Sequence, residues 1–194
     1  TSAMAVTWGS DISGFSGVIN VTDVASFTVA DPSLLTDGTF NIAAGKSISL
    51  EPTAAKTLGA ATLITAGTGK LVLNADTSAR VVTVPSTSNI TGVANIELTR
   101  GQLKITGANE LSTSAVITTA ASNSTLDIDA SQSIATLTHS GAMDIASGVT
   151  LTQTGAAASV IAGTITGPGT YTLNDSTSAM AVTWGSDISG FSGV

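Results

Sequence analysis

The feature that most restricts the fold of this chain is an exact repeat. Residues 1–18 read TSAMAVTWGSDISGFSGV, and residues 177–194 read the same eighteen letters without a change. A duplication that has diverged does not stay identical over this length, so the repeat indicates a unit under tandem expansion. We therefore interpret residues 1–176 as one full period, with 177–194 as the start of the next identical period.

A weaker repeat lies inside this period. The segment GTGKLVLNADTSARVVTVPS (67–86) resembles GPGTYTLNDSTSAMAVTWGS (167–186), and the exact repeat extends this match to the start of the chain, where TSAMAVTW (1–8) resembles TSARVVTV (77–84). These matches predict a short unit over 1–76 and a long unit over 77–176, with an extra module near 141–164. Proteins that gain whole modules in this way are stacks, in which each module contacts only its neighbours.

Several short stretches alternate between apolar and polar residues. GQLKITG places Leu103 and Ile105 on one face, and STLDIDAS does the same with Leu126 and Ile128. This period of two is typical of strands with one buried face. The many Thr, Val and Ile residues favour strands, and the Gly, Asn and Ser residues between them favour turns. Only 10% of the residues are charged and the mean hydropathy is +0.41, which excludes a disordered chain.

The predicted fold class is therefore all-β, and the predicted architecture is a right-handed parallel β-solenoid. We expect about seven coils of roughly 25 residues in each period, about three in the short unit and about four in the long one. A closed barrel fits less well, because an added module changes its strand number and shear. Inward side chains of successive coils would stack into a core that includes Trp8, Leu73, Val82, Leu103, Ile105, Leu126, Ile128, Leu173 and Trp184.

Residues 101–175 resemble the passenger repeats of bacterial autotransporters and related giant repetitive surface adhesins. The matching phrases are GQLKITGANELS, STLDI and QSIATLTHSG, and GPGTYTLN (167–174) resembles a phrase common between such repeats. The resemblance implies a β-helix displayed at the surface of a Gram-negative bacterium. The membrane barrel domain that follows an autotransporter passenger is absent from this sequence, so the resemblance leaves the route of secretion open.

Few residues are candidates for chemistry. Asp127 and Asp129 share one strand face and are the candidate pair for Ca²⁺ or for glycoside cleavage, although a solvated outer face is favoured for them. His139 is the only histidine, and residues 105–194 contain no Lys or Arg. Cysteine is absent, which excludes thiolate chemistry. We expect no enzyme activity and no cofactor. For Trp8, a sugar-stacking or partner-anchoring role is the alternative to core packing.

The expected function is that of a structural extracellular filament or stalk, used in adhesion, cell–cell contact or an outer coat. Its expected partner is itself, through end-to-end stacking of identical repeats, with a cell-surface glycan or another cell as a further partner. A surface-layer lattice protein is the alternative, and a polysaccharide-active β-helix enzyme is the third interpretation. The net charge of −7 and six scattered basic residues argue against nucleic acid, and no apolar run is long enough to span a membrane as a helix.

Overall fold

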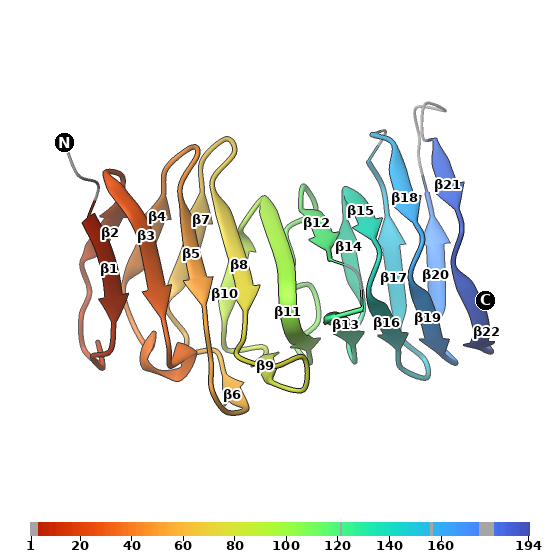
Figure 1. The fold of residues 1–194 in the computed structure, drawn as a ribbon, viewed down its shortest axis with the longest axis horizontal. Coiled ribbons are helices and arrows are strands. Elements are labelled where there is room, and N and C mark those ends of the chain that lie inside the picture. The colour runs from red at the N-terminus through yellow and green to blue at the C-terminus, as the bar shows by residue number, and fades with distance from the viewer. Residues whose placement is uncertain (1–3, 121, 156, 175–180) are drawn as a thin grey trace.

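The computed structural model describes residues 4–120, 122–155, 157–174 and 181–194. The chain winds into a β-solenoid of about nine turns, whose strands lie side by side along the long axis of the molecule (Figure 1). Every strand pair among the described residues is parallel. The predicted fold class, an all-β parallel solenoid, is confirmed. No helix in the described part of the chain is long and apolar enough to cross a membrane.

Each turn of the coil has three sides, and the first side carries a strand in every turn. Its nine strands pair in the order of the chain, so that each lies beside the strand one turn earlier and the strand one turn later. They are β1 (Met4–Trp8), β3 (Val24–Val29), β5 (Ser47–Leu50), β8 (Lys70–Asn74), β11 (Asn95–Ile105), β12 (Val116–Thr119), β15 (Thr136–His139), β18 (Ser159–Ile161) and β21 (Val182–Trp184).

The second side is joined to the first through β11, which runs over the corner between them. Gly101 lies at this corner with a φ of +106°, and a Cβ there would lie 2.9 Å from the Cβ of Ala75, so glycine suits both the backbone and the space. The C-terminal half of β11 therefore belongs to the second side. The other strands of this side are β6 (Lys56–Thr57), β9 (Val81–Val84), β13 (Ser124–Ile128), β16 (Ala142–Ile145), β19 (Thr164–Gly167) and β22 (Asp187–Phe191).

The third side consists of two smaller sheets. The four-stranded sheet contains β2 (Val18–Val21), β4 (Thr39–Ile42), β7 (Thr62–Thr65) and β10 (Asn89–Gly92), and the three-stranded sheet contains β14 (Gln132–Ile134), β17 (Thr150–Gln153) and β20 (Thr170–Leu173). A short 3-10 helix, η1 (Pro32–Leu34), occupies one corner of an early turn.

Between these two sheets, one turn has no strand on the third side, over residues 106–115. The side chain of Gln132 bridges this gap. Its Oε1 accepts a 3.0 Å hydrogen bond from the Leu111 N–H, and its Nε2 donates a 2.7 Å bond to the Gly107 carbonyl. Gln132 is buried, so these bonds satisfy polar groups that would otherwise be costly inside the coil.

The strand register gives the length of each coil, and this length varies. The turn that brings Ile117 to Leu137 is a short one, and the turn that brings Leu71 to Ile96 is longer. Eight such turns lead from Val6 to its copy Val182, so the mean coil has about 22 residues. The expected seven coils of roughly 25 residues are therefore corrected to eight shorter ones. The expectation rests on the length of a single inserted segment, and most coils of the solenoid are shorter than that segment.

The core is a continuous apolar column along the inside of the coil. Six of the predicted core residues are at most 2% exposed, namely Leu73, Val82, Leu103, Ile105, Leu126 and Ile128. Trp8 is partly exposed and packs against the core. Leu173 and Trp184, also predicted as core, are instead 45% and 46% exposed, because β20 and β21 are the last strands of their sheets and no further strand of the described residues pairs with their outer edges.

The internal similarity between segments does not follow position in the coil. The strand β8 lies on the first side, whereas β20, which lies in the matching segment 167–186, belongs to the third. The extra module near 141–164 spans about one turn, since Ala142 pairs with Thr164. The division into a short and a long unit stays a prediction from the sequence.

Candidate functional site

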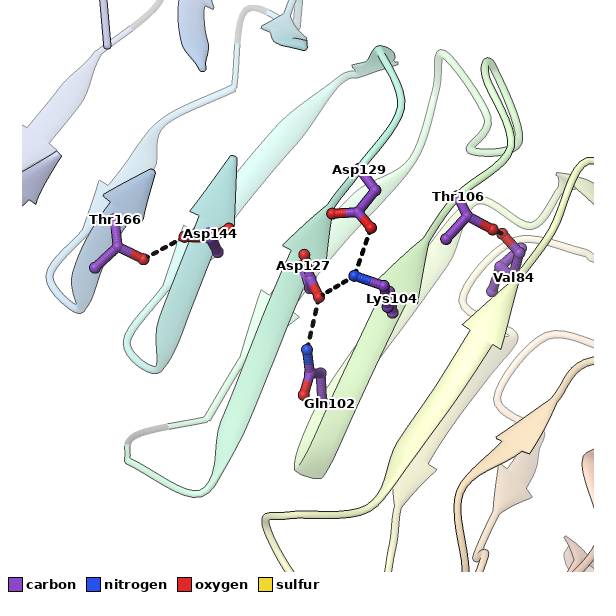
Figure 2. A network of polar contacts seen from close by, with 8 residues as sticks. All are labelled: Val84, Gln102, Lys104, Thr106, Asp127, Asp129, Asp144 and Thr166. Carbon is purple, nitrogen blue, oxygen red and sulfur yellow. Dashed lines mark hydrogen bonds and ion pairs between the residues drawn. The ribbon is translucent and has the colours of Figure 1, made fainter. Parts of the chain in front are cut away.

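The predicted carboxylate pair lies on the outer surface of the second side. Figure 2 shows Asp127 on β13 and Asp129 just beyond that strand, both facing Lys104 on β11. The Lys104 Nζ lies 2.8 Å from Asp127 Oδ2 and 2.5 Å from Asp129 Oδ2. The Nε2 of Gln102 donates a 2.7 Å hydrogen bond to the same oxygen of Asp127. We call these four residues the lysine-bridged cluster.

Strand register and alternation explain why these side chains meet. Leu103 and Ile105 point into the core, so Gln102 and Lys104 point outward from the same strand. The parallel pairing of β11 with β13 places Lys104 directly opposite Asp127. Side chains in this relation on neighbouring strands are within reach of each other, and opposite charges attract there.

The electrostatics of the cluster depend on the burial of Asp127, whose side chain is only 9% exposed. Burial raises the pKa of Asp127, the hydrogen bond from Lys104 opposes this shift, and the nearby charge of Asp129 adds to it. Hydrogen bonds to Asp127 and Asp129 raise the pKa of Lys104. The ammonium therefore stays charged and compensates the buried carboxylate.

The cluster already contains its own cation. The ammonium of Lys104 lies between the two carboxylates, in the position that a metal ion shared by them would take (Figure 2). The next outward residue in this column, Asp144, accepts a 2.7 Å hydrogen bond from the Thr166 hydroxyl. Among the described residues, no group of three or more His, Cys, Asp or Glu side chains is placed to hold a metal ion. The arrangement is that of a structural ion pair.

The only histidine is inside the coil. His139 is the last residue of β15 and is fully buried. Its Nε2 lies 3.2 Å from the Thr164 carbonyl, which can only accept, so this nitrogen carries the proton. The Nδ1 then accepts a 2.9 Å hydrogen bond from the Thr119 hydroxyl. Burial lowers the pKa of His139, so a neutral ring is favoured.

All six basic side chains have acceptors within the protein. Four of them form ion pairs, and the other two donate to backbone carbonyls: Lys56 with Asp31, Lys70 with Glu97, Arg80 with Asp76, Lys104 with Asp127 and Asp129, Lys46 with the Val24 carbonyl, and Arg100 with the Ala75 carbonyl. This arrangement offers no cluster of uncompensated positive charge for a phosphate backbone.

A feature that the sequence did not indicate lies at the first turn. A pocket of about 500 Å³ opens there, lined by Trp8, Asp11, Ile12, Phe15 and Ile19, among others. The ring of Trp8 stacks on Phe27 at a centroid distance of 5.9 Å and meets the edge of Phe40 at 5.9 Å. One face of the indole is thus covered by the next coil. Of the lining residues, the sequence singled out only Trp8, as a candidate for sugar stacking or partner anchoring.

Comparison with known proteins identifies no similar protein. No family model matches the chain, and no curated protein or solved structure does so either. The arguments for function therefore come from the chain itself. Its basic side chains form hydrogen bonds and ion pairs within the chain. Its most distinctive property is the identity of residues 1–18 and 177–194.

Proposed function

We propose that this chain is one period of a structural filament, in which identical β-solenoid repeats follow one another along one axis. The observation that carries the proposal is the whole number of coils in the sequence period. Val6 and its copy Val182 are separated by eight complete turns and lie in the same row of strands on the first side. A period with a fractional number of coils would bring the repeated segment onto a different side.

A further copy of the repeat would extend the same sheets without a change of face. Parallel strands pair above and below along the whole stack, so the hydrogen-bonded ladder continues wherever another coil follows. The stacking of inward side chains would also continue across the junction. Trp184 contacts Tyr171 of the preceding coil, and its copy Trp8 contacts Phe27 of the following coil. A Trp at an internal junction would have both neighbours.

The setting we propose for this filament is the surface of a bacterial cell, where it serves adhesion, cell–cell contact or an outer coat. The resemblance of residues 101–175 to autotransporter passenger repeats supports this setting. The lack of cysteine and the net charge of −7 are compatible with an acidic extracellular fibre, because like charges on neighbouring fibres oppose lateral association.

The proposal is tested with a chain of two periods, residues 1–176 followed by 1–194, compared with the single chain by small-angle X-ray scattering. Strands are spaced about 4.8 Å apart, so eight added coils lengthen the rod by about 38 Å at constant cross-section. The junction Trp is then covered on both sides, and the Trp emission shifts to shorter wavelength. Two beads joined by a hinge, or a wider particle, would contradict the proposal.

Electron microscopy of the native material separates a filament from the alternatives. A filament gives a meridional reflection at about 4.8 Å and an axial repeat of about 38 Å. A two-dimensional lattice that loses order on chelation of Ca²⁺ would instead favour a surface-layer protein. Release of reducing sugars from pectin or a similar glycan would favour the enzyme.

A further inference from the structure

Another pocket lies where the strands of the first side begin, on a different side of the coil from the lysine-bridged cluster. Its volume is about 340 Å³, and it spans three successive coils at β5, β8 and β11, which pair side by side (Figure 1). Its lining includes Lys46, Ser47, Thr68, Lys70, Val72 and Glu97. We call it the two-lysine pocket. Ligand pockets have volumes of about 300–1,000 Å³, so this one suits a small ligand unit.

Strand alternation and register bring these side chains together. The inward residues of the three strands are buried in the core, so the residues between them point outward. Parallel pairing places Ser47 opposite Lys70 and Val72 opposite Glu97. Each of the three strands is paired on both sides, so a peptide strand finds no sheet edge to join here. Side chains must therefore recognise the ligand.

The pocket contains one positive charge that no carboxylate compensates. The Lys70 Nζ lies 2.8 Å from Glu97 Oε2, so this glutamate balances one of the two lysines. Lys46 donates a 3.3 Å hydrogen bond to the Val24 carbonyl and forms no ion pair in the described part of the chain. Two lysines and one glutamate give the pocket a net charge of +1, on a chain whose net charge is −7. A single anionic group matches this charge.

The pocket also contains both donors and acceptors for uncharged polar groups. An ammonium carries three N–H donors, so Lys46 and Lys70 keep donors for a ligand. The Oγ1 of Thr68 accepts a 3.0 Å hydrogen bond from the Gly45 N–H, which leaves its hydroxyl hydrogen to donate. Glu97 accepts from Lys70 and keeps lone pairs for hydroxyl donors. Lys46 reaches back toward β3 and Glu97 lies on β11, so the free cation and the acceptor are at opposite ends of the pocket.

We propose that the two-lysine pocket binds a sugar acid, namely a uronic acid unit of an acidic glycan. The carboxylate of the sugar binds the ammonium of Lys46, and its hydroxyl groups donate to Glu97 and accept from Lys70. The side chain of Val72, between them, contacts the apolar face of the ring. This inference rests on the proposed surface filament and names the class of glycan to which the filament attaches.

The charges of the pocket favour a sugar acid over other anions. A densely sulfated or phosphorylated polymer brings several negative charges close together, and Glu97 repels them. A neutral sugar supplies hydroxyl groups but no counter-charge for Lys46. A uronic acid carries one charge and several hydroxyl groups on one ring, which matches one uncompensated lysine beside one carboxylate acceptor.

The first experiment measures binding of the full chain to immobilised polygalacturonate with a surface biosensor. Fully methyl-esterified polygalacturonate is the matched polymer, because it keeps the ring hydroxyls and loses the carboxylate charge. We expect the chain to bind the free acid about tenfold more tightly than the ester, which is the effect of losing one charged hydrogen bond. Equal binding to the two polymers would overturn the proposal.

Two variants of matched charge locate the binding. Lys46→Gln should lower the affinity for polygalacturonate about tenfold. Lys56→Gln removes the same charge from the second side, where Lys56 pairs with Asp31 outside the pocket, and should bind as the unaltered chain does. Circular dichroism checks that both variants are folded. Equal losses in the two variants would show a general attraction of charge and would reject the pocket.

A third variant measures selectivity and a fourth confirms the position. Glu97→Gln keeps an oxygen acceptor but removes the repelling charge, so it should bind dextran sulfate more tightly than the unaltered chain does. Lys70→Gln leaves Glu97 without its cation, so it should weaken binding to polygalacturonate. If the unaltered chain binds dextran sulfate as tightly as polygalacturonate, the pocket is a general anion site and the proposal is wrong.

The result is independent of the test of the proposed function. A two-period chain that forms one continuous rod but does not bind polygalacturonate would leave the filament in place and reject the sugar-acid site. A single chain that binds polygalacturonate through Lys46, with a two-period chain that forms two separate bodies, would keep the site and reject the filament.

Discussion

The ring of Tyr171 lies 6.3 Å from that of Trp184, and its hydroxyl donates a 2.8 Å hydrogen bond to the Oε1 of Gln153 inside the coil. Burial raises the pKa of Tyr171. Tyr171 is the only tyrosine in the chain, so the tyrosine titration measures the folding of the last turns of the solenoid.

We predict that Tyr171 does not ionise near the ordinary tyrosine pKa of about 10 while the protein is folded. The folded state holds the proton and the unfolded state releases it, so this residue stabilises the fold fully below about pH 10 and its contribution is lost as the pH rises further. Absorbance near the tyrosinate band during an alkaline titration measures this, with the chain in urea as the control. A native titration midpoint near that of the urea control would contradict it.

A second prediction concerns His139, whose pKa is lowered by burial. The unfolded chain binds this proton more readily, so the stability that His139 contributes is present above its ordinary pKa of about 6.5 and is lost as the pH falls below it. Urea unfolding about one pH unit above and one below that value should show a lower free energy of unfolding at the acidic pH. His139→Gln should lose most of this difference, and an unchanged pH dependence in that variant would rule out the assignment.

Removal of the cation from the lysine-bridged cluster should destabilise the fold. Lys104→Met leaves the carboxylate of Asp127 without its charged partner, and we expect a loss of about 1–3 kcal/mol in the free energy of unfolding. The matched control is Lys70→Met, which breaks the exposed pair with Glu97 and should cost about 0–1 kcal/mol. Asp127→Asn in the Lys104→Met background should recover part of the loss. Equal losses in the free energy of unfolding for Lys104→Met and Lys70→Met would show that the burial of Asp127 does not affect stability.

The exposure of the last coil predicts a contrast between two leucines. Leu126→Ala removes a side chain that is fully buried in the core, and should cost about 2–5 kcal/mol. Leu173→Ala removes a side chain that is 45% exposed, and should cost about 1 kcal/mol or less. Thermal or urea unfolding of both variants measures the difference. In the two-period chain the first Leu173 is covered by the following coil, and there its substitution should become more costly.

The alternation of side chains was readable from the sequence, and the length of the coil was not. Leu103, Ile105, Leu126 and Ile128 alternate with polar residues, and in the structure all four point inward. The length of a coil depends on its corners, which carry no periodic signal. For this reason the turn that begins at Ile117 closes sooner than the turn that begins at Leu71.

The same uncertainty in coil length concealed the lysine-bridged cluster. The sequence places Asp127 and Asp129 on one face, but their partner is one turn away. A coil of roughly 25 residues would place Asp127 opposite Gln102, whereas the shorter coil that is observed places it opposite Lys104. Residues 11–15 form a turn, whereas the identical residues 187–191 form β22. The sequence could not predict this difference, because two identical segments differ only in the coils beside them.

The whole number of coils between Val6 and Val182 also has a consequence for binding strength. In a chain with further copies, any surface residue would recur on the same side of the rod about every 38 Å. A receptor array facing that side would meet many equal epitopes at a fixed spacing, so that weak single contacts combine into strong attachment through avidity. Copies added or lost as whole periods would change the valency and leave the geometry of each epitope unchanged.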